Sequence, residues 1–86
     1  MKVIWTKHAE ERQKEWEKKL GITKQAVEDL VNSPAQIGPG DMEALVAQKR
    51  VRNGLLRTPF IEMGESRKIL TVYWTSKVER YWREEI

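Results

Sequence analysis

Cysteine is absent from this chain of 86 residues, so disulfide bonds and thiolate metal sites are both excluded. Histidine occurs once and aspartate twice, which leaves little material for a histidine or carboxylate metal site. No apolar run approaches the roughly 20 residues that a membrane-spanning helix needs. The short apolar stretch at the N-terminus does not predict a signal peptide. We therefore expect a single soluble cytoplasmic domain, residues 1–86, with no membrane partner, metal or other cofactor.

Positive charge is concentrated in the second half of the sequence. Residues 1–43 carry 7 basic and 8 acidic side chains, whereas residues 44–86 carry 9 basic and 5 acidic ones. Residues 44–61 contain no acid, but they do contain Lys49, Arg50, Arg52 and Arg57. This distribution favours a polyanion such as RNA as partner, although a solvated basic surface would give the same pattern.

The first half predicts one short strand and two helices. Residues 3–5 are typical of a strand. A helix over 7–20 is expected between an N-cap at Thr6 and a C-terminal glycine, Gly21. Thr23 is the expected cap of a second helix, which ends near residue 32 before a proline. Its apolar positions form a stripe suited to packing on a core.

The second half predicts three antiparallel strands, which we place at residues 44–51, 55–63 and 67–75. Asn53-Gly54 and Gly64-Glu65 are the expected two-residue turns between them. The expected fold class is therefore α+β, in the order β-α-α-β-β-β, with two N-terminal helices packed on an antiparallel sheet.

Prolines and one capping motif add three local expectations. Gly38-Pro39-Gly40 is expected to form a turn. Pro59 lacks an N–H, so a bulge or an edge-facing position is expected within the second of these strands. Residues 76–79 fit a capping box, which predicts a short helical turn near the C-terminus.

The two turns also predict how the strands pair. They would place Arg50 opposite Arg57, and Glu62 opposite Arg67. Two arginines opposite each other repel unless an anion or an acid lies between them. Because side chains alternate between faces, three arginines and three apolar or aromatic residues of the neighbouring strand would share one face. These are Arg50, Arg52, Arg57, Leu70, Val72 and Trp74.

The arginine group is the strongest candidate for a functional site. Arginine binds phosphate through a planar fork and does not lose its charge. Beside Tyr73 and Trp74, such a group could hold a nucleic-acid backbone and stack a base. The alternative is that the acids Glu84 and Glu85 fold back and neutralise the arginines.

A second candidate lies at the start of the first helix, where His8 and Arg12 share a face. His8 could act as acid or base, with Arg12 stabilising negative charge. Alternatively, His8 bonds to backbone at the helix entry and Arg12 stacks on Trp16. The tail over residues 80–83 alternates cations with aromatics, and we favour packing over nucleic-acid contact for it.

Several short motifs follow one another along nearly the whole chain. In order, they are His8-Ala9-x-x-Arg12, Gly21-Ile22-Thr23, Val27 and Val31, Pro34, Thr71-Val72-Tyr73 and Arg80-Tyr81-Trp82. Their order and spacing resemble an uncharacterised bacterial family, domain of unknown function family 4258, which is grouped with the RelE/ParE-like toxin superfamily. The resemblance implies a strand, two helices and an antiparallel sheet.

The same resemblance implies a toxin-like component of a bacterial toxin–antitoxin pair. RelE-like toxins cut messenger RNA without metal, through basic and tyrosine side chains on the sheet and near the C-terminus, whereas ParE-like relatives bind gyrase. We therefore expect a metal-independent ribonuclease. Its expected catalytic residues are Arg50, Arg57, His8 and Tyr73. Its expected nucleic-acid-binding residues are Lys49, Arg52, Arg12, Trp74 and Arg80.

Two other functions stay open. The basic sheet face would hold a protein partner, such as an antitoxin, or a nucleic acid in a non-catalytic binding module. A third alternative is an orphan domain that keeps the fold for an unrelated role.

Overall fold

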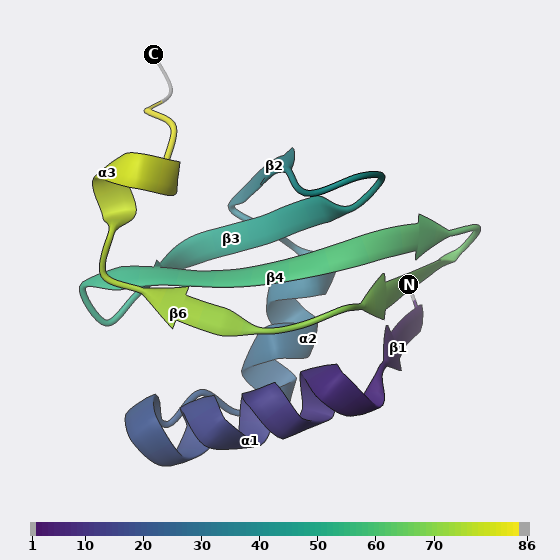
Figure 1. Cartoon of the computed structure of the whole chain (residues 1–86), viewed down its shortest axis with the longest axis horizontal. Coiled ribbons are helices and arrows are strands. Elements are labelled where there is room, and N and C mark those ends of the chain that lie inside the picture. The colour runs from purple at the N-terminus through teal and green to yellow at the C-terminus, as the bar shows by residue number, and fades with distance from the viewer. Residues whose placement is uncertain (1, 85–86) are drawn as a thin grey trace.

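The computed structural model describes residues 2–84, which form a six-stranded sheet and three helices (Figure 1). The class is α+β, as predicted. No helix within these residues is long and apolar enough to cross a membrane. In chain order the elements are β1 Lys2–Trp5, α1 Lys7–Leu20, α2 Lys24–Asn32, β2 Gln36–Pro39, β3 Leu45–Val51, β4 Gly54–Met63, β5 Ser66–Ile69, β6 Tyr73–Thr75 and α3 Val78–Tyr81.

The sheet is mixed rather than antiparallel throughout. Its order is β1-β5-β4-β3-β2, and β6 pairs with β4 beyond the end of β5. The edge strand β1 runs parallel to β5, so the prediction of a purely antiparallel sheet is wrong at this edge. A parallel pair needs a long crossover connection, and α1 and α2 form part of the chain between β1 and β5.

The helices α1 and α2 cover one face of the sheet, which we call the helix face. Ala47, Leu56 and Phe60 of the central strands point into the core on this side, where they meet Leu30 and Val31 of α2. Burying a large aliphatic or aromatic side chain contributes roughly 1.5–3 kcal/mol, so this layer stabilises the fold. The opposite face, which we call the cleft face, carries the alternate residues of the same strands.

Both predicted helix starts and the predicted C-terminal glycine of α1 are confirmed. The Thr6 hydroxyl accepts a hydrogen bond from the N–H of Ala9 and donates one to the carbonyl of Ile69 at 2.9 Å. Gly21 ends α1 with a φ of 72°, a left-handed conformation that glycine adopts easily. Thr23 caps α2 in the same way as Thr6 caps α1. The start of α1 is therefore tied to the end of β5.

The turn of the β3–β4 hairpin lies one residue earlier than predicted. Arg52 and Asn53 are the turn residues, with φ values of 50° and 63°, and Val51 pairs with Gly54. Gly54 belongs to the strand because the Trp74 ring and the neighbouring backbone lie where a side chain at this position would have to be. Tertiary packing thus decides which residues form the turn.

The pairing predicted for the arginines is consequently wrong. Arg57 lies opposite Gln48, and Arg50 lies opposite Leu55. Because each partner is displaced by two residues, Arg50 and Arg57 still share the cleft face. Arg52 leaves that group, since its guanidinium reaches Gly21 at the end of α1.

The strand predicted over residues 67–75 is interrupted, because β5 and β6 pair with β4 in different registers. The predicted pair of Glu62 with Arg67 is confirmed, with an ion pair of 3.1 Å. Further along, Arg57 lies opposite Tyr73. Between these two pairs β4 advances five residues and its partner advances six. The partner therefore contains one extra residue, which is a bulge.

The bulge lies at Leu70 and Thr71, beside Pro59, but it is in the segment that pairs with β4 and not in β4 itself, where it was expected. The carbonyl of Pro59 accepts a hydrogen bond from the N–H of Leu70 at 2.9 Å, but proline has no N–H to return. After the bulge the alternation is reversed. Val72 and Trp74 point to the helix face instead of joining the arginines, so that part of the face prediction is wrong.

Residues 38–40 were expected to form a turn, but Gly38 and Pro39 belong to the edge strand β2. This strand pairs antiparallel with β3, with Gln36 opposite Gln48. Pro39 is tolerated because an edge strand does not need every N–H. The predicted C-terminal helical turn is present as α3.

The fold predicts the effect of one core substitution. Thr58 is fully buried on the helix face, and its hydroxyl has no hydrogen-bond partner within residues 2–84. Thr58→Val keeps the shape and removes a desolvated hydroxyl, so we expect the free energy of unfolding to rise by about 1 kcal/mol. Thr58→Ala should lower it, because a methyl-sized cavity remains. Denaturant titration followed by tryptophan fluorescence measures both. A loss of stability in Thr58→Val would mean that the hydroxyl has a partner.

Candidate functional site

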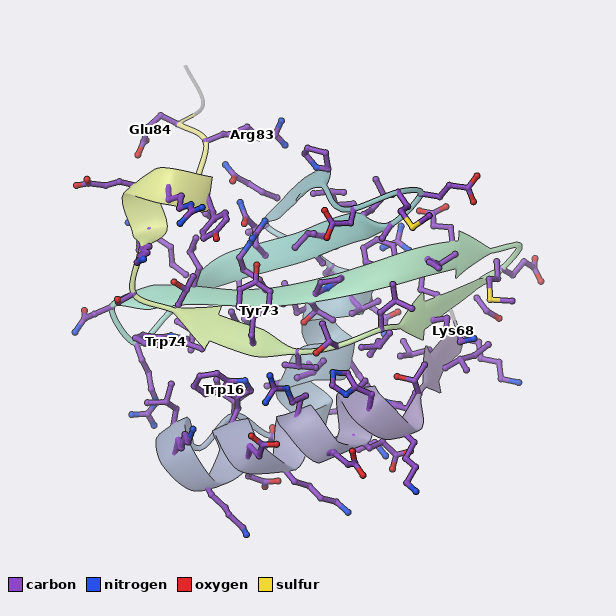
Figure 2. The ribbon with its side chains drawn as sticks, viewed as in Figure 1. Trp16, Lys68, Tyr73, Trp74, Arg83 and Glu84 are labelled. Atoms are coloured by element: carbon purple, nitrogen blue, oxygen red, sulfur yellow. The ribbon has the colours of Figure 1, made fainter. Side chains whose placement is uncertain are left out.

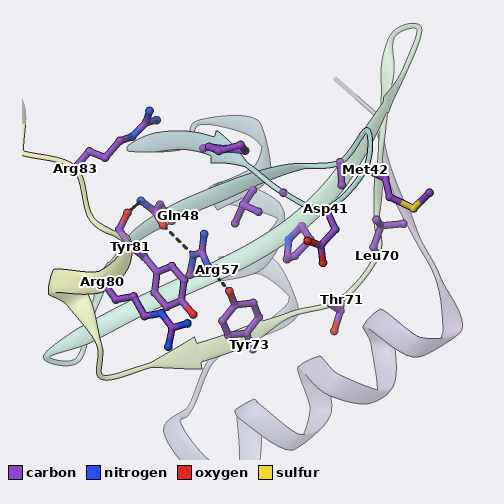
Figure 3. A pocket seen from close by; sticks show the side chains of 16 residues that line it. Asp41, Met42, Gln48, Arg57, Leu70, Thr71, Tyr73, Arg80, Tyr81 and Arg83 are labelled. Atoms are coloured by element: carbon purple, nitrogen blue, oxygen red, sulfur yellow. Dashed lines mark hydrogen bonds between the residues drawn. The ribbon is translucent and has the colours of Figure 1, made fainter.

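A cleft of about 900 Å³ lies on the cleft face (Figure 3). Its floor is formed by β3, β4 and the chain around the bulge. One wall comes from residues 38–44, and the other comes from α3 and the chain that follows it. The charged and polar side chains that line it are Asp41, Gln48, Arg57, Thr71, Tyr73, Arg80, Tyr81 and Arg83.

Arg57 lies at the floor of this cleft and is only 8% exposed. Its Nε donates to Oε1 of Gln48 at 3.0 Å, and its Nη1 donates to the hydroxyl of Tyr73. Its guanidinium lies 3.9 Å from the ring centroid of Tyr81. Within residues 2–84, no ion pair involves Arg57. A buried cation is usually paired with an acid, so this cleft has a charge that an anionic ligand would neutralise.

A second arginine lies on the same aromatic ring. The guanidinium of Arg80 is 5.5 Å from the Tyr81 ring centroid, so one ring contacts two cations. Arg83 also lines the cleft, and Asp41 is the one acid among the described lining residues. Like charges gathered around a neutral ring repel one another, and an anion bound between them would relieve that repulsion.

Burial raises the pKa of the Tyr73 phenol above its ordinary value. The nearby charge of Arg57 acts in the opposite direction but does not outweigh desolvation, and Tyr81 adds to the upward shift. Tyr73 is therefore neutral at physiological pH. Since its oxygen accepts a hydrogen bond from Arg57, its own O–H can be donated to a ligand in the cleft.

Two buried glutamines connect the floor of the cleft to the C-terminal tail. Nε2 of Gln48 donates to Oε1 of Gln36 at 2.8 Å and to the carbonyl of Tyr81 at 3.1 Å. Gln36 in turn hydrogen-bonds to both the N–H and the carbonyl of Arg83. The tail is therefore attached to the sheet beside the cleft, and packing of the tail is confirmed.

Three of the predicted site residues, Arg57, Tyr73 and Arg80, meet in the cleft. Arg50 lies on the same face but outside the lining. Its guanidinium carbon lies 4.9 Å from the ring centroid of Trp82, and its Nη2 lies 3.6 Å from Oε1 of Glu84. The neutralising contact considered as the alternative thus forms between Glu84 and Arg50, and not with Arg57. Glu85, the other acid expected to fold back, lies outside the described residues.

The N-terminal candidates lie elsewhere. His8 and Arg12 are exposed on α1, and neither lines the cleft. Arg12 pairs with Glu15 at 3.2 Å, whereas Lys19 lies over the Trp16 ring that Arg12 was expected to cover. The sequence prediction that combined His8 with the sheet arginines is not met by the fold.

The remaining predicted contacts lie on the helix face or at the turn. Trp74 packs on Trp16 with ring centroids 6.5 Å apart, and both rings lie between the sheet and α1 (Figure 2). Lys49 is opposite Leu56, so it also points to the helix face. Arg52, as described, lies by the end of α1.

Sequence analysis missed Gln48 and Gln36 and gave Tyr81 and Arg83 no role in the cleft. One signal was present. Gln48 follows four consecutive apolar residues, 44–47, and a glutamine that continues an apolar strand has to find buried partners. Which partners it finds depends on β2 and the tail, and neither could be placed from local pattern.

No protein-family model matches this chain, and neither does a curated protein or a solved structure. What the cleft can do is therefore inferred from its own chemistry.

The raised pKa of Tyr73 predicts an alkaline titration that can be measured. The tyrosinate absorbance of the unmodified chain minus that of Tyr73→Phe should show a phenol that ionises above pH 10.0. Because the folded state holds this proton more tightly than the unfolded state, the free energy of unfolding should fall as pH rises through that range. Tyr73→Phe should lack this part of the fall. Ionisation at or below pH 10.0 would contradict the effect of burial.

Proposed function

We propose that the cleft binds single-stranded RNA and cleaves it without a metal ion, as a toxin-like component of a bacterial toxin–antitoxin pair of the RelE/ParE-like type. The observation that carries the proposal is the buried guanidinium of Arg57, whose hydrogen-bonding partners are neutral. The motif order described above supports the toxin-like class.

The arrangement of donors suits a phosphodiester. The hydrogen bonds of Arg57 within residues 2–84 use Nε and Nη1, which leaves Nη2 for a phosphate oxygen. Arg80, whose guanidinium lies 5.5 Å from the centroid of the Tyr81 ring that Arg57 also contacts, offers a second planar fork. Two guanidinium groups can bind two non-bridging oxygens of one phosphate, and such charge-assisted bonds are the strong ones.

The proposed reaction is attack by the RNA 2′-hydroxyl on its adjacent phosphorus. A bond forms between the 2′-oxygen and phosphorus, and the bond from phosphorus to the 5′-oxygen breaks, leaving a 2′,3′-cyclic phosphate and a 5′-hydroxyl. Arg57 and Arg80 stabilise the extra negative charge that develops on the phosphoryl oxygens.

Proton transfer in this mechanism uses Tyr73 and solvent. The neutral phenol of Tyr73 donates its proton to the departing 5′-oxygen and then recovers one from water. The proton of the 2′-hydroxyl goes to solvent hydroxide, because the chain's single histidine, His8, does not line the cleft. Cleavage should therefore become faster as pH rises, until Tyr73 ionises.

Cleavage of RNA in the presence of a chelator tests the proposal, with Arg57→Lys as the decisive variant. Lysine keeps the charge but loses the fork, so we expect the cleavage rate to fall by about 100-fold. Arg12→Lys is the matched control, since Arg12 is exposed on α1, and it should cleave at the unmodified rate. Products should carry 2′,3′-cyclic phosphate ends. Absence of cleavage, or equal cleavage by Arg57→Lys, would contradict catalysis.

The lack of an imidazole in the described lining favours a second candidate function. In this alternative the same basic cleft holds an acidic segment of a protein partner, such as an antitoxin, or a nucleic acid without cutting it. RNA that binds with a steep dependence on salt and stays intact would favour this function over catalysis.

A further inference from the structure

We propose that Gln48 is the positioning residue of the cleft: its side-chain amide orients the guanidinium of Arg57 and, being neutral, keeps the positive charge available to an anionic ligand. This inference rests on the proposed anion-binding function. It assigns a role to a side chain that is 2% exposed and 3.0 Å from the arginine that it serves.

The amide of Gln48 has one orientation that satisfies its neighbours. Its Oε1 faces the Nε–H of Arg57, and its Nε2 faces the carbonyl of Tyr81 (Figure 3). The same Nε2 also faces a second acceptor, Oε1 of Gln36. If the amide were turned over, its NH₂ would oppose the N–H of the guanidinium, and its oxygen would oppose two other oxygens. The hydrogen-bond pattern therefore fixes the direction in which Oε1 points.

Gln36 is fixed by the backbone in the same manner. Its Oε1 accepts from Nε2 of Gln48 and from the N–H of Arg83 at 3.2 Å, and its Nε2 donates to the Arg83 carbonyl. Backbone groups cannot turn over as side-chain amides can. The orientation of Arg57 is therefore set by a chain of hydrogen bonds that begins at the tail and passes through two buried amides.

The neutrality of Gln48 matters as much as its geometry. A carboxylate at this position would also accept the Nε–H of Arg57, but it would neutralise the charge and compete with a phosphate. Arg67, on β5, shows the other arrangement in the same sheet. Its guanidinium is paired with the carboxylate of Glu62 at 3.1 Å and bonded to the carbonyl of Val31 at 2.7 Å, so its charge is neutralised internally, although its buried Nε has no partner within residues 2–84. Gln48 holds the guanidinium of Arg57 in place without neutralising its positive charge.

Two substitutions of Gln48 separate these effects. Gln48→Leu removes the acceptor, so Arg57 loses its orientation, and Gln48→Glu keeps an acceptor but neutralises the charge. Both should weaken binding of a fluorescent single-stranded oligouridine, measured by anisotropy in chelator, by about tenfold. Gln48→Leu does so because Arg57 loses a hydrogen bond to its charged group, and Gln48→Glu does so because the carboxylate competes with the phosphate for Arg57. Gln13→Leu is the matched control, because Gln13 is also buried, at 3% exposure, and within residues 2–84 its amide donates to the side chain of Glu17 on α1 and to the carbonyl of Ile22, away from the cleft. It should lose stability without losing affinity.

A second readout does not depend on RNA. The Nε–H of Arg57 should give a slowly exchanging nitrogen-15 NMR signal, assigned by its absence from Arg57→Lys. We expect this signal to be lost in Gln48→Leu and kept in Gln13→Leu. Persistence of the signal in Gln48→Leu would overturn the positioning role, whatever the chain binds.

The outcomes for binding are equally distinct. If the unmodified chain does not bind the oligouridine, the proposed function fails, and the NMR signal still decides whether Gln48 orients Arg57. If the unmodified chain binds and Gln48→Leu binds as tightly, the inference fails while the proposed function stands. If Gln48→Glu retains full affinity for the oligouridine, the claim that the neutral Gln48 keeps the positive charge of Arg57 available to a ligand is overturned.

Discussion

Pro59 has no N–H to give to a neighbouring strand, and the sheet accommodates this with one extra residue between β5 and β6. Most of the chemistry described above depends on that residue. It places Tyr73, in the position that Val72 would otherwise take, opposite Arg57. The same change sends Val72 into the core and Trp74 onto the helix face. The positions of Val72 and Trp74 on the helix face and of Tyr73 in the cleft are therefore consequences of one irregularity.

The two faces of the sheet bury side chains of opposite character, although these side chains come from neighbouring residues of the same strands. On the helix face, apolar side chains leave water and stabilise the fold. On the cleft face, the Arg57 guanidinium is taken out of water, and its partners among residues 2–84 are an amide, a phenol and aromatic rings. That arrangement costs stability, and proteins commonly keep such a cost at a functional site. Arg50, only a few residues away, carries no comparable cost because it is exposed and paired with Glu84.

Local signals predicted the features that local physics controls. The caps at Thr6 and Thr23 and the glycine that ends α1 depend on backbone geometry and hydrogen bonding within a few residues. The Gly64-Glu65 turn was found for the same reason, and it placed Glu62 opposite Arg67 correctly.

Features that depend on distant parts of the chain could not be predicted in this way. The β3–β4 turn has two plausible positions, and the choice is made by the Trp74 ring lying against Gly54. The strand β2 contains glycine and proline, which favour turns, and it forms because β3 offers it a partner. For the site, arginine and tyrosine chemistry was visible in the sequence. Gln48 was not, because its role exists only once Gln36 and the tail lie beside it.

The attachment of the tail has a consequence for how this chain behaves among copies of itself. The outer edge of β2 would ordinarily offer a template to which another chain could add a strand. At this edge the carbonyl of Ile37 already accepts a hydrogen bond from the Arg83 guanidinium. Two residues further, Pro39 has no N–H to offer. The C-terminal tail at Arg83, which helps to orient the cleft residues, therefore also protects this edge against strand-to-strand aggregation.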